Sequence, residues 1–269
     1  MTDEPVAIIG AGRMGRGVSL ALRVAGVPAA LLGRDRGIEE VRGAALVLVA
    51  VPDDAIGVVA AELARDRAVE PHHVVLHLSG ALDRLALHAL VDTGAALGSF
   101  HPLQSIADPE TAPSRLRGAY AGLEGDTRAL EAGERLALAL GMRAVRLAPG
   151  AKAAYHAGAV FASNYMVVLA SAAAHLAERA GVPPGDAQAL YLPLMAGTVA
   201  NLAQGPAGAL TGPIRRGDAA TVARHLSLLS GEDRELYREL GLRALELARL
   251  AGLGEAPAAA VEQVLQRPV

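Results

Sequence analysis

The first half of the chain alternates short apolar runs with longer segments of helical spacing. The apolar runs cover residues 6–9, 29–32, 45–51 and 74–78, and the segments 13–25, 53–65 and 83–92 have the spacing of helices. Near-continuous apolar strands that alternate with helices are typical of a parallel sheet with helices on both faces. The pattern therefore predicts an α/β domain.

The second half has a different pattern. Shorter strand candidates follow at 98–101, 120–123 and 144–147, and then the strand pattern stops. From there to the end, Ala- and Leu-rich segments with helical spacing are interrupted only by short Gly- and Pro-containing breaks. A length of 269 residues fits two domains. We expect a mostly parallel sheet domain at 1–149, followed by an all-α domain at 150–269.

A glycine motif follows the first predicted strand and opens the first predicted helix: Gly10-Ala-Gly-Arg-Met-Gly15. In this place Gly10 allows a tight turn, Gly12 lets the backbone approach a pyrophosphate, and Gly15 lets helix and sheet pack closely. The amide groups of the helix N-terminus would bind the phosphates. We predict a Rossmann-type dinucleotide site that includes Arg13 and Met14.

The end of the second strand distinguishes NAD from NADP. An acidic residue there would bind the ribose hydroxyls of NAD, but this chain has Gly33 followed by Arg34. A guanidinium suits the 2′-phosphate, so we expect NADP as the cofactor. If Asp35 faces the ribose instead, the preference reverses.

Residues after the next strands are expected at the same edge of the sheet, where open α/β folds bind ligands. Val51 and Pro52 should form a wall over the cofactor, and Asp53 should cap the next helix. Ser79 is a candidate to contact the nicotinamide or the substrate. His101 is either a site residue or a buried structural histidine.

Lys152 is the only lysine among the 25 Lys and Arg residues of the chain. Unlike guanidinium, an ammonium is compact and can have its pKa lowered enough to release a proton, as a general acid must. Helical spacing places His156 and Ser163 on the same side, with Asn164 on the flank. Whether Lys152 or His156 is the acid stays open. We expect the two to act together, with Asn164 orienting the substrate.

Composition excludes several classes of protein. The net charge of −3 without a basic stripe argues against nucleic acid. The absence of cysteine excludes disulfides and thiolate metal sites and fits the cytoplasm, and no metal centre is expected. The chain has no secretion-signal pattern and no uninterrupted apolar run of about 18 residues, so we expect no membrane partner. Wide Ala and Leu faces in the second half predict a homodimer through the helical domain.

The motifs together resemble a bacterial family with a Rossmann-like N-terminal domain and a helical C-terminal domain of unknown function. The resemblance lies in the segments 10–15, 51–54, 77–81, 99–103, 152–157 with Asn164, and 210–218. Its layout is similar to ketopantoate reductases, pyrroline-5-carboxylate reductases and β-hydroxyacid dehydrogenases. In the last group a lysine at the position of Lys152 donates a proton. An asparagine four residues later binds substrate, and here His156 stands in that place.

The resemblance implies an NADPH-dependent reductase of a small oxo acid carrying a carboxylate, with ketopantoate as one candidate. Alternatives are an imine reductase of the pyrroline-5-carboxylate type and a non-catalytic NADP-binding module. A reductase that transfers hydride between NADP and a deazaflavin shares the N-terminal layout and is a weaker variant.

Overall fold

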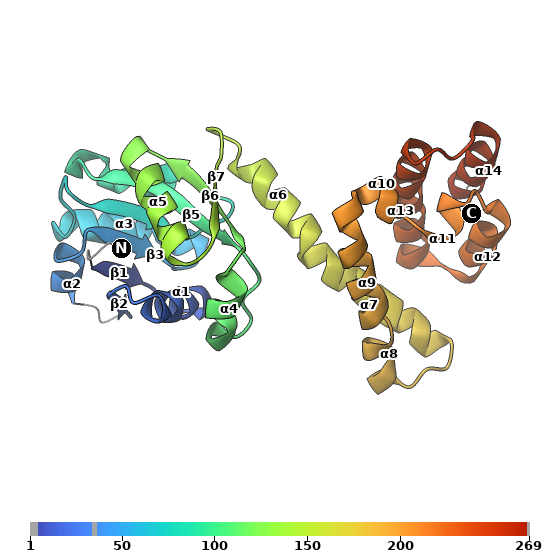
Figure 1. Ribbon diagram of the computed structural model, residues 1–269, viewed down its shortest axis with the longest axis horizontal. Helices are drawn as coiled ribbons and strands as arrows, with labels where there is room; N and C mark the ends of the chain where they lie inside the picture. Colours follow the sequence, from blue (N-terminus) through green and yellow to red (C-terminus); the bar gives the residue numbers. More distant parts are fainter. Residues whose placement is uncertain (1–4, 34–36, 268–269) are drawn as a thin grey trace. The chain divides into compact units, whose positions relative to one another are not determined.

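The computed structural model describes residues 5–33 and 37–267 of the chain (Figure 1). Its residues divide into two compact units, Met1–Tyr165 and Met166–Val269. The strand pattern does stop close to residue 149, because β7 (Arg143–Arg146) is followed by helix α6 (Lys152–Ala162). Helix α6 nevertheless groups with the first unit, so this division falls after Tyr165.

The first unit is built on one seven-stranded sheet of order β2-β1-β3-β4-β5-β6-β7. Neighbouring strands are parallel except for β5 and β6, which run antiparallel. The predicted α/β domain with a mostly parallel sheet is confirmed. The strands besides β7 are β1 (Val6–Ile9), β2 (Ala29–Leu32), β3 (Leu46–Val49), β4 (Val74–His77), β5 (Ala96–Leu103) and β6 (Tyr120–Gly125).

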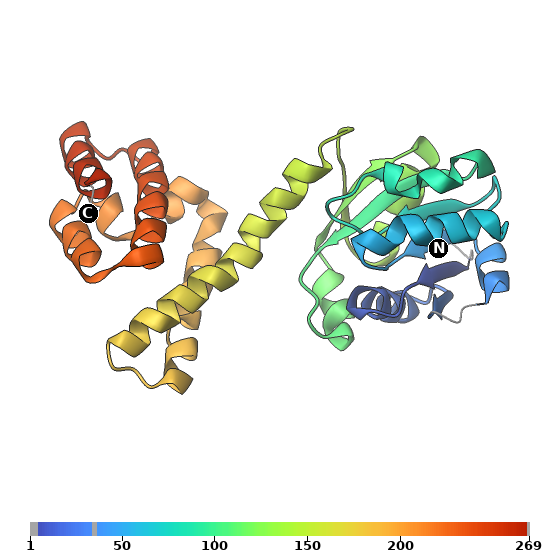
Figure 2. The ribbon, with the colours of Figure 1, turned by 180° about the vertical axis from the view of Figure 1, so that it is seen from behind.

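Helices cover both faces of this sheet, because side chains alternate between the two faces along each strand. On one face α1 (Arg13–Val24), α4 (Ala112–Leu116) and α5 (Thr127–Ala139) bury one apolar cluster (Figure 1). On the other face α2 (Ile38–Arg42), α3 (Asp53–Arg65) and the 3₁₀ segment η1 (Arg84–Thr93) bury a second (Figure 2). A short 3₁₀ turn, η2 (Pro109–Thr111), precedes α4.

The segment predicted as a helix at 83–92 is η1, a 3₁₀ helix with a kink at Leu87. The Asp83 carboxylate caps it by accepting from the Leu85 amide. Leu87 and Leu90 are both fully buried, and residues three apart lie above one another in a 3₁₀ helix. The spacing of these buried residues therefore fits the tighter turn.

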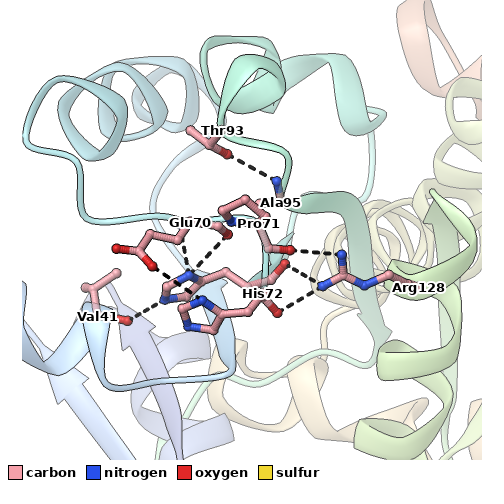
Figure 3. Close-up of polar contacts among 8 residues, drawn as sticks. Val41, Glu70, Pro71, His72, Thr93, Ala95 and Arg128 are labelled. Carbon is pink, nitrogen blue, oxygen red and sulfur yellow. Dashed lines mark hydrogen bonds and ion pairs between the residues drawn. The ribbon is translucent and has the colours of Figure 1, made fainter.

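A buried histidine, His73, holds the loop that leads into β4, and Figure 3 labels its partners Val41 and Glu70. His73 is fully buried, its Nδ1 accepts from the Glu70 amide at 3.0 Å, and its Nε2 donates to the Val41 carbonyl at 3.0 Å. Arg128 of α5 donates to the carbonyls of Pro71, His72 and His73. Both ring nitrogens serve the backbone, so His73 has a structural role in placing β4.

The second unit is helical in all its described elements, which confirms the expected all-α region. It starts within α7 (Asn164–Arg179), and α12, α13 and α14 enclose its main apolar core of Val222, Leu226, Leu245, Val261 and Leu265. The other elements are α8 (Pro184–Leu190), α9 (Leu192–Asn201), η3 (Leu202–Gln204), α10 (Pro206–Ala209), α11 (Gly212–Arg215), α12 (Ala219–Leu228), α13 (Gly231–Leu250) and α14 (Glu255–Gln266).

Helices α7 and α9 have a largely exposed apolar surface in this structure. Val167 is 70% exposed and Leu194 is 66% exposed. By length and composition alone, the segment Lys152–Arg179 could cross a membrane, with a mean hydropathy of 1.5. The sequence-based expectation counted only uninterrupted apolar runs, whereas this average includes the interspersed Ser, Asn and His residues.

Candidate cofactor groove and active site

The glycine motif forms the turn between β1 and α1. Gly10 has a φ of +117°, and a Cβ there would collide with the Ala50 carbonyl of the neighbouring strand connection. Gly15 lies directly against the Gly10 carbonyl, so helix and turn pack without room for a side chain. Gly12 is the N-cap of α1, and a Cβ there would meet no protein atom within 4 Å. Gly12 is exposed, and the amides of the first helical turn have no acceptor within the helix.

A groove of about 440 Å³ lies at this helix N-terminus. It contains five of the residues predicted to bind the cofactor, namely Gly12, Arg13, Met14, Val51 and Pro52. The other lining residues are Ala50, Ser105, Ile106 and Ala107, so none of the described lining residues is a carboxylate. Helix N-terminal amides and an arginine, without an acidic group among the described lining residues, fit the pyrophosphate of a dinucleotide. Arg34 and Asp35, on which the choice of NADP rests, lie outside the described residues.

A second cavity of about 640 Å³ adjoins this groove, because Ser105 lines both. Three of the predicted catalytic residues line it: His101 from β5, His156 from α6, and Asn164 at the start of α7. Ser79 and Lys152 do not line it. Ser105 was missed by the sequence analysis, although it comes only four residues after His101.

The remaining described residues that line the second cavity carry no acidic group. They are Leu103, Gln104, Tyr155, Gly158, Ala159, Val160, Ala162 and Ser163.

Ser79, which follows β4, is hydrogen-bonded to the start of α3. The side chain is buried, and its hydroxyl donates to Asp53 Oδ2 at 2.9 Å while it accepts from the amides of Ala81 and Leu82. The expectation that Asp53 caps α3 is wrong, because the N-cap is Pro52 and the Asp53 side chain makes no capping bond. The Asp53 carboxylate instead accepts from Ser79, so this hydrogen bond ties the loop after β4 to the start of α3.

Lys152 lies inside the first unit rather than on a solvated face. Its side chain is 2% exposed, and Nζ donates to the Ser79 carbonyl at 2.7 Å. Burial lowers the pKa of Lys152 to about 8, against the attraction of nearby carboxylates, chiefly Glu124. The ammonium still has two N–H donors besides the one bonded to Ser79. The structure thus holds a buried lysine with a depressed pKa, whose Nζ lies 5.9 Å from the ring of the cavity residue Tyr155.

Two histidines lie close to Lys152: His77 ends β4, and His101 lies in the part of the neighbouring strand β5 that pairs with β6. Burial lowers the pKa of His77 to about 4, and the ring makes backbone bonds at both nitrogens, from the Ser79 amide and to the Asp83 carbonyl. Burial also lowers the pKa of His101 to about 4, with a further contribution from the charge of Lys152. Both rings are therefore neutral near pH 7.

Helix α6 brings Tyr155 and His156 to His101. The Tyr155 hydroxyl lies 3.0 Å from His101 Nδ1, and the rings of His101 and His156 are 5.9 Å apart. A Cβ at Gly80 would lie 2.8 Å from His101 Nε2 and would collide with His156 Nδ1, so the glycine makes room for both imidazoles. Nδ1 of His156 is buried without a partner among the residues that the structure describes. Tyr155 was not singled out from the sequence.

The neutral imidazole of His101 lines a cavity whose described lining carries no acidic group, and the buried Lys152 ammonium lies 5.9 Å from the ring of Tyr155, another lining residue. Such donors stabilise an oxygen that gains negative charge when a carbonyl is reduced. A dinucleotide groove that adjoins such a cavity, on a sheet of this topology, is the layout of NAD(P)-binding reductases.

Comparisons with protein families agree with this class. Residues 36–102 match the model of a Rossmann-like domain, and residues 119–244 match the model of a domain of unknown function, DUF2520. The chain therefore joins a Rossmann-like N-terminal domain to a DUF2520 C-terminal domain, which confirms the resemblance noted from the motifs. The DUF2520 match begins in the first unit, just before β6, and includes α6 with Lys152 and His156.

Solved structures share the fold over nearly the whole chain. A protein from Thermotoga maritima is 25% identical with a TM-score of 0.71, over 91% of this chain and 98% of the other. A Bacteroides fragilis protein named as a candidate NADP oxidoreductase is 20% identical with a TM-score of 0.70, over the same shares. The NADP-bound pyrroline carboxylate reductase of Plasmodium falciparum is 13% identical with a TM-score of 0.57, over 99% and 97%. A comparison with curated proteins gave no significant match.

Proposed function

We propose that the protein is an NADPH-dependent reductase that transfers hydride to the carbonyl carbon of a small oxo acid, with ketopantoate as the first substrate to test. The observation that supports this most directly is Ser105, which lines both the dinucleotide groove and the cavity with His101, His156 and Asn164. A substrate in the cavity would then be next to the cofactor, as hydride transfer requires.

When bound, NADPH supplies the hydride, and the protein supplies binding, orientation and a proton. The amides at Gly12 and Arg13 hold the phosphates at the N-terminus of α1. His101 and Asn164 orient the carbonyl and carboxylate oxygens of the substrate. Lys152 and His156 act together to deliver a proton to the oxygen that becomes the alcohol.

The second candidate function is reduction of a cyclic imine such as pyrroline-5-carboxylate. Its support is the position of Lys152, whose Nζ donates to the Ser79 carbonyl and does not line the cavity. A protonated imine already carries its proton and needs little help from an acid. Fold similarity to a pyrroline carboxylate reductase adds to this candidate, although at 13% identity it concerns the fold alone.

An NADPH-oxidation screen separates the candidates. The substrates are ketopantoate, other 2-oxo and 3-oxo acids, and cyclic imines, each tested with wild type and Lys152→Met. If Lys152 supplies the proton, we expect kcat for an oxo acid to fall by about 10²- to 10⁴-fold in Lys152→Met. For an imine the loss should be much smaller. An undiminished kcat on an oxo acid would reject Lys152 as proton source.

Binding measurements complete the screen. We expect NADPH to bind more tightly than NADH, and the reverse order would reject the argument from Arg34. A protein that binds NADPH but turns over none of these substrates, before or after substitution of Lys152, is a binding module rather than a reductase.

A further inference from the structure

Tyr155 and His101 form a specific pair inside the first unit. The Tyr155 oxygen lies 3.0 Å from His101 Nδ1, and the two rings meet edge to face with centroids 5.6 Å apart. In the β5–β6 register His101 stands opposite Gly122. A Cβ at Gly122 would lie 2.7 Å from Cζ and from the oxygen of Tyr155, so only a glycine lets the phenol reach His101.

Counting donors and acceptors assigns the proton between these two side chains. A phenol has one proton to donate, and its oxygen can also accept a hydrogen bond. Among the described residues, His101 Nδ1 is the partner of this hydroxyl. If Nδ1 carried a proton, it would donate to the phenol oxygen, and the phenol proton would have no acceptor among the described residues. Both groups have a hydrogen-bond partner when the Tyr155 hydroxyl donates to an unprotonated Nδ1 of His101.

Burial acts on both groups in the direction that this arrangement needs. It raises the pKa of Tyr155 above its usual value and lowers the pKa of His101 to about 4. Near neutral pH the phenol keeps its proton and the imidazole holds a single proton. With Nδ1 occupied as an acceptor, that single proton belongs on Nε2.

Nε2 of His101 is free to bind a ligand. It has no hydrogen-bond partner in the part of the chain that the structure describes. It is also not among the fully buried unpartnered atoms there, so it is accessible. His101 lines the 640 Å³ cavity, in which the other polar side chains are Gln104, Ser105, Tyr155, His156, Ser163 and Asn164.

We infer that Tyr155 is a positioning residue, whose hydroxyl fixes the proton of His101 on Nε2 so that the imidazole donates to an oxygen of the substrate. The identity of that oxygen, in a carboxylate or a carbonyl, rests on the proposed function. The position of the proton does not.

Histidine NMR on the full chain tests the proton position without any substrate. With ¹⁵N-labelled histidine at pH 7, and His101→Gln to assign the signals, we expect His101 to be protonated on Nε2 with a hydrogen-bonded Nδ1. In Tyr155→Phe the Nδ1 resonance should move toward that of an unbonded imidazole nitrogen. Protonation on Nδ1 in the wild type, or an unchanged Nδ1 resonance in Tyr155→Phe, overturns the inference. The wild-type spectrum decides the first point even if the variant fails to fold.

The chain offers a matched control for these spectra. In the second unit His225 Nδ1 lies 2.8 Å from the Tyr237 oxygen, with rings 5.8 Å apart. Tyr237→Phe should move the His225 signals and leave those of His101 unchanged. A shift of His101 in this control would show that the effect is not specific to Tyr155.

Kinetics then test whether the pair serves the substrate. In Tyr155→Phe we expect KM for ketopantoate to rise about ten-fold, with a smaller change in kcat and an unchanged KM for NADPH. Tyr120→Phe, at a 44% exposed tyrosine of β6, is the control for the same chemical change. In a His101→Gln background, adding Tyr155→Phe should change KM by less than about two-fold, because Tyr155 acts through His101. Independent effects of the two substitutions overturn the positioning role.

Failure of the proposed function gives a different result. If the wild type reduces none of the oxo acids or imines, the reductase proposal fails, and the NMR result still decides whether Tyr155 sets the proton of His101.

Discussion

Two histidines that are kept neutral by burial make the first unit sensitive to acid. The pKa values of His77 and His101 lie near 4 in the folded chain, against 6.5 for an ordinary histidine. Between pH 6.5 and 4 the unfolded chain therefore binds more protons at these positions than the folded chain. Because stability rises with pH wherever the unfolded state binds more protons, their contribution is present above pH 6.5 and lost as pH falls toward 4.

Urea unfolding at pH 7 and pH 4.5 measures this contribution at His101. The free energy of unfolding of the wild type should fall between these pH values by more than that of His101→Gln, because glutamine does not titrate. Carboxylates affect both proteins equally, so the difference between the two slopes isolates the imidazole. Equal slopes would mean that His101 is not desolvated in the folded protein.

Lys152 gives opposite pH effects on stability and on activity. Its pKa is about 8 in the folded chain, against 10.5 for an ordinary exposed lysine. Between these values the unfolded lysine keeps a proton that the folded one has released, so stability rises with pH over this window. If Lys152 supplies the reaction proton, kcat falls over the same window.

Comparison with Lys152→Met measures both effects. The wild type should gain stability relative to the variant from pH 8 to pH 10.5, while its kcat for the oxo acid declines above about pH 8. The variant should show neither change. A wild-type kcat that stays constant to about pH 10 contradicts the role of Lys152 as acid.

At the scale of elements, the two glycines of the turn between β1 and α1 are expected to have different roles, one in the fold and one in cofactor binding. Gly10 and Gly12 are two residues apart, but only Gly10 is crowded by protein and has a positive φ. Gly10→Ala should therefore cost stability, of the order of 1–3 kcal/mol. Gly12→Ala loses only a favourable N-cap, which is worth about 1 kcal/mol or less.

NADPH titrations and thermal unfolding of both variants check this distinction. Gly12→Ala should keep a melting temperature near that of the wild type and raise the Kd for NADPH at least about ten-fold, because its methyl group enters the groove. Gly10→Ala should lower the melting temperature clearly. Unchanged NADPH binding in Gly12→Ala would place the dinucleotide elsewhere.

The elements were predictable where burial alone determines them. Strands buried on both faces are apolar at nearly every position, so β1, β3 and β4 were found within a few residues of their observed ends. The edge strand β2 is less buried, and its apolar run was sufficient to find it. The 3₁₀ form of η1 could not be predicted, because a short run with apolar residues at Leu87 and Leu90 fits either type of helix. Tertiary packing determines which type forms. The prediction that Asp53 caps α3 was wrong, because its carboxylate accepts a hydrogen bond from Ser79, a residue distant in sequence.

The site was predictable only in its residue types. The glycine motif and the lone lysine stand out in the sequence, and the structure places His101, His156 and Asn164 on one cavity. Partners could not be predicted, because Lys152 bonds to a carbonyl 73 residues away and Tyr155 meets His101 from 54 residues away. That second contact depends on Gly122 being opposite His101, a register that apolar patterning does not reveal.

At the scale of the whole molecule, the exposed apolar surfaces of α7 and α9 favour a protein partner over a bilayer. The start of the apolar segment Lys152–Arg179 is committed to the first unit, where Lys152 is buried against Ser79. The 16 residues of α7 that remain span about 24 Å, short of the roughly 30 Å of a hydrocarbon core. A second copy of the chain presents the same apolar surface, and two-fold symmetry would place the two surfaces against each other.

We therefore propose a homodimer through these helices and expect single charges on them to weaken it. Val167→Glu on α7 and Leu194→Glu on α9 replace side chains that are 70% and 66% exposed, so the monomer should tolerate both. Sedimentation at micromolar concentration should show a dimer for the wild type and a shift to monomer for each variant. Leu138→Glu on α5, 79% exposed in the first unit, should leave the dimer intact. A monomeric wild type would contradict the dimer. If the wild type floats with lipid vesicles instead, the partner of these helices is a membrane surface and not a second copy.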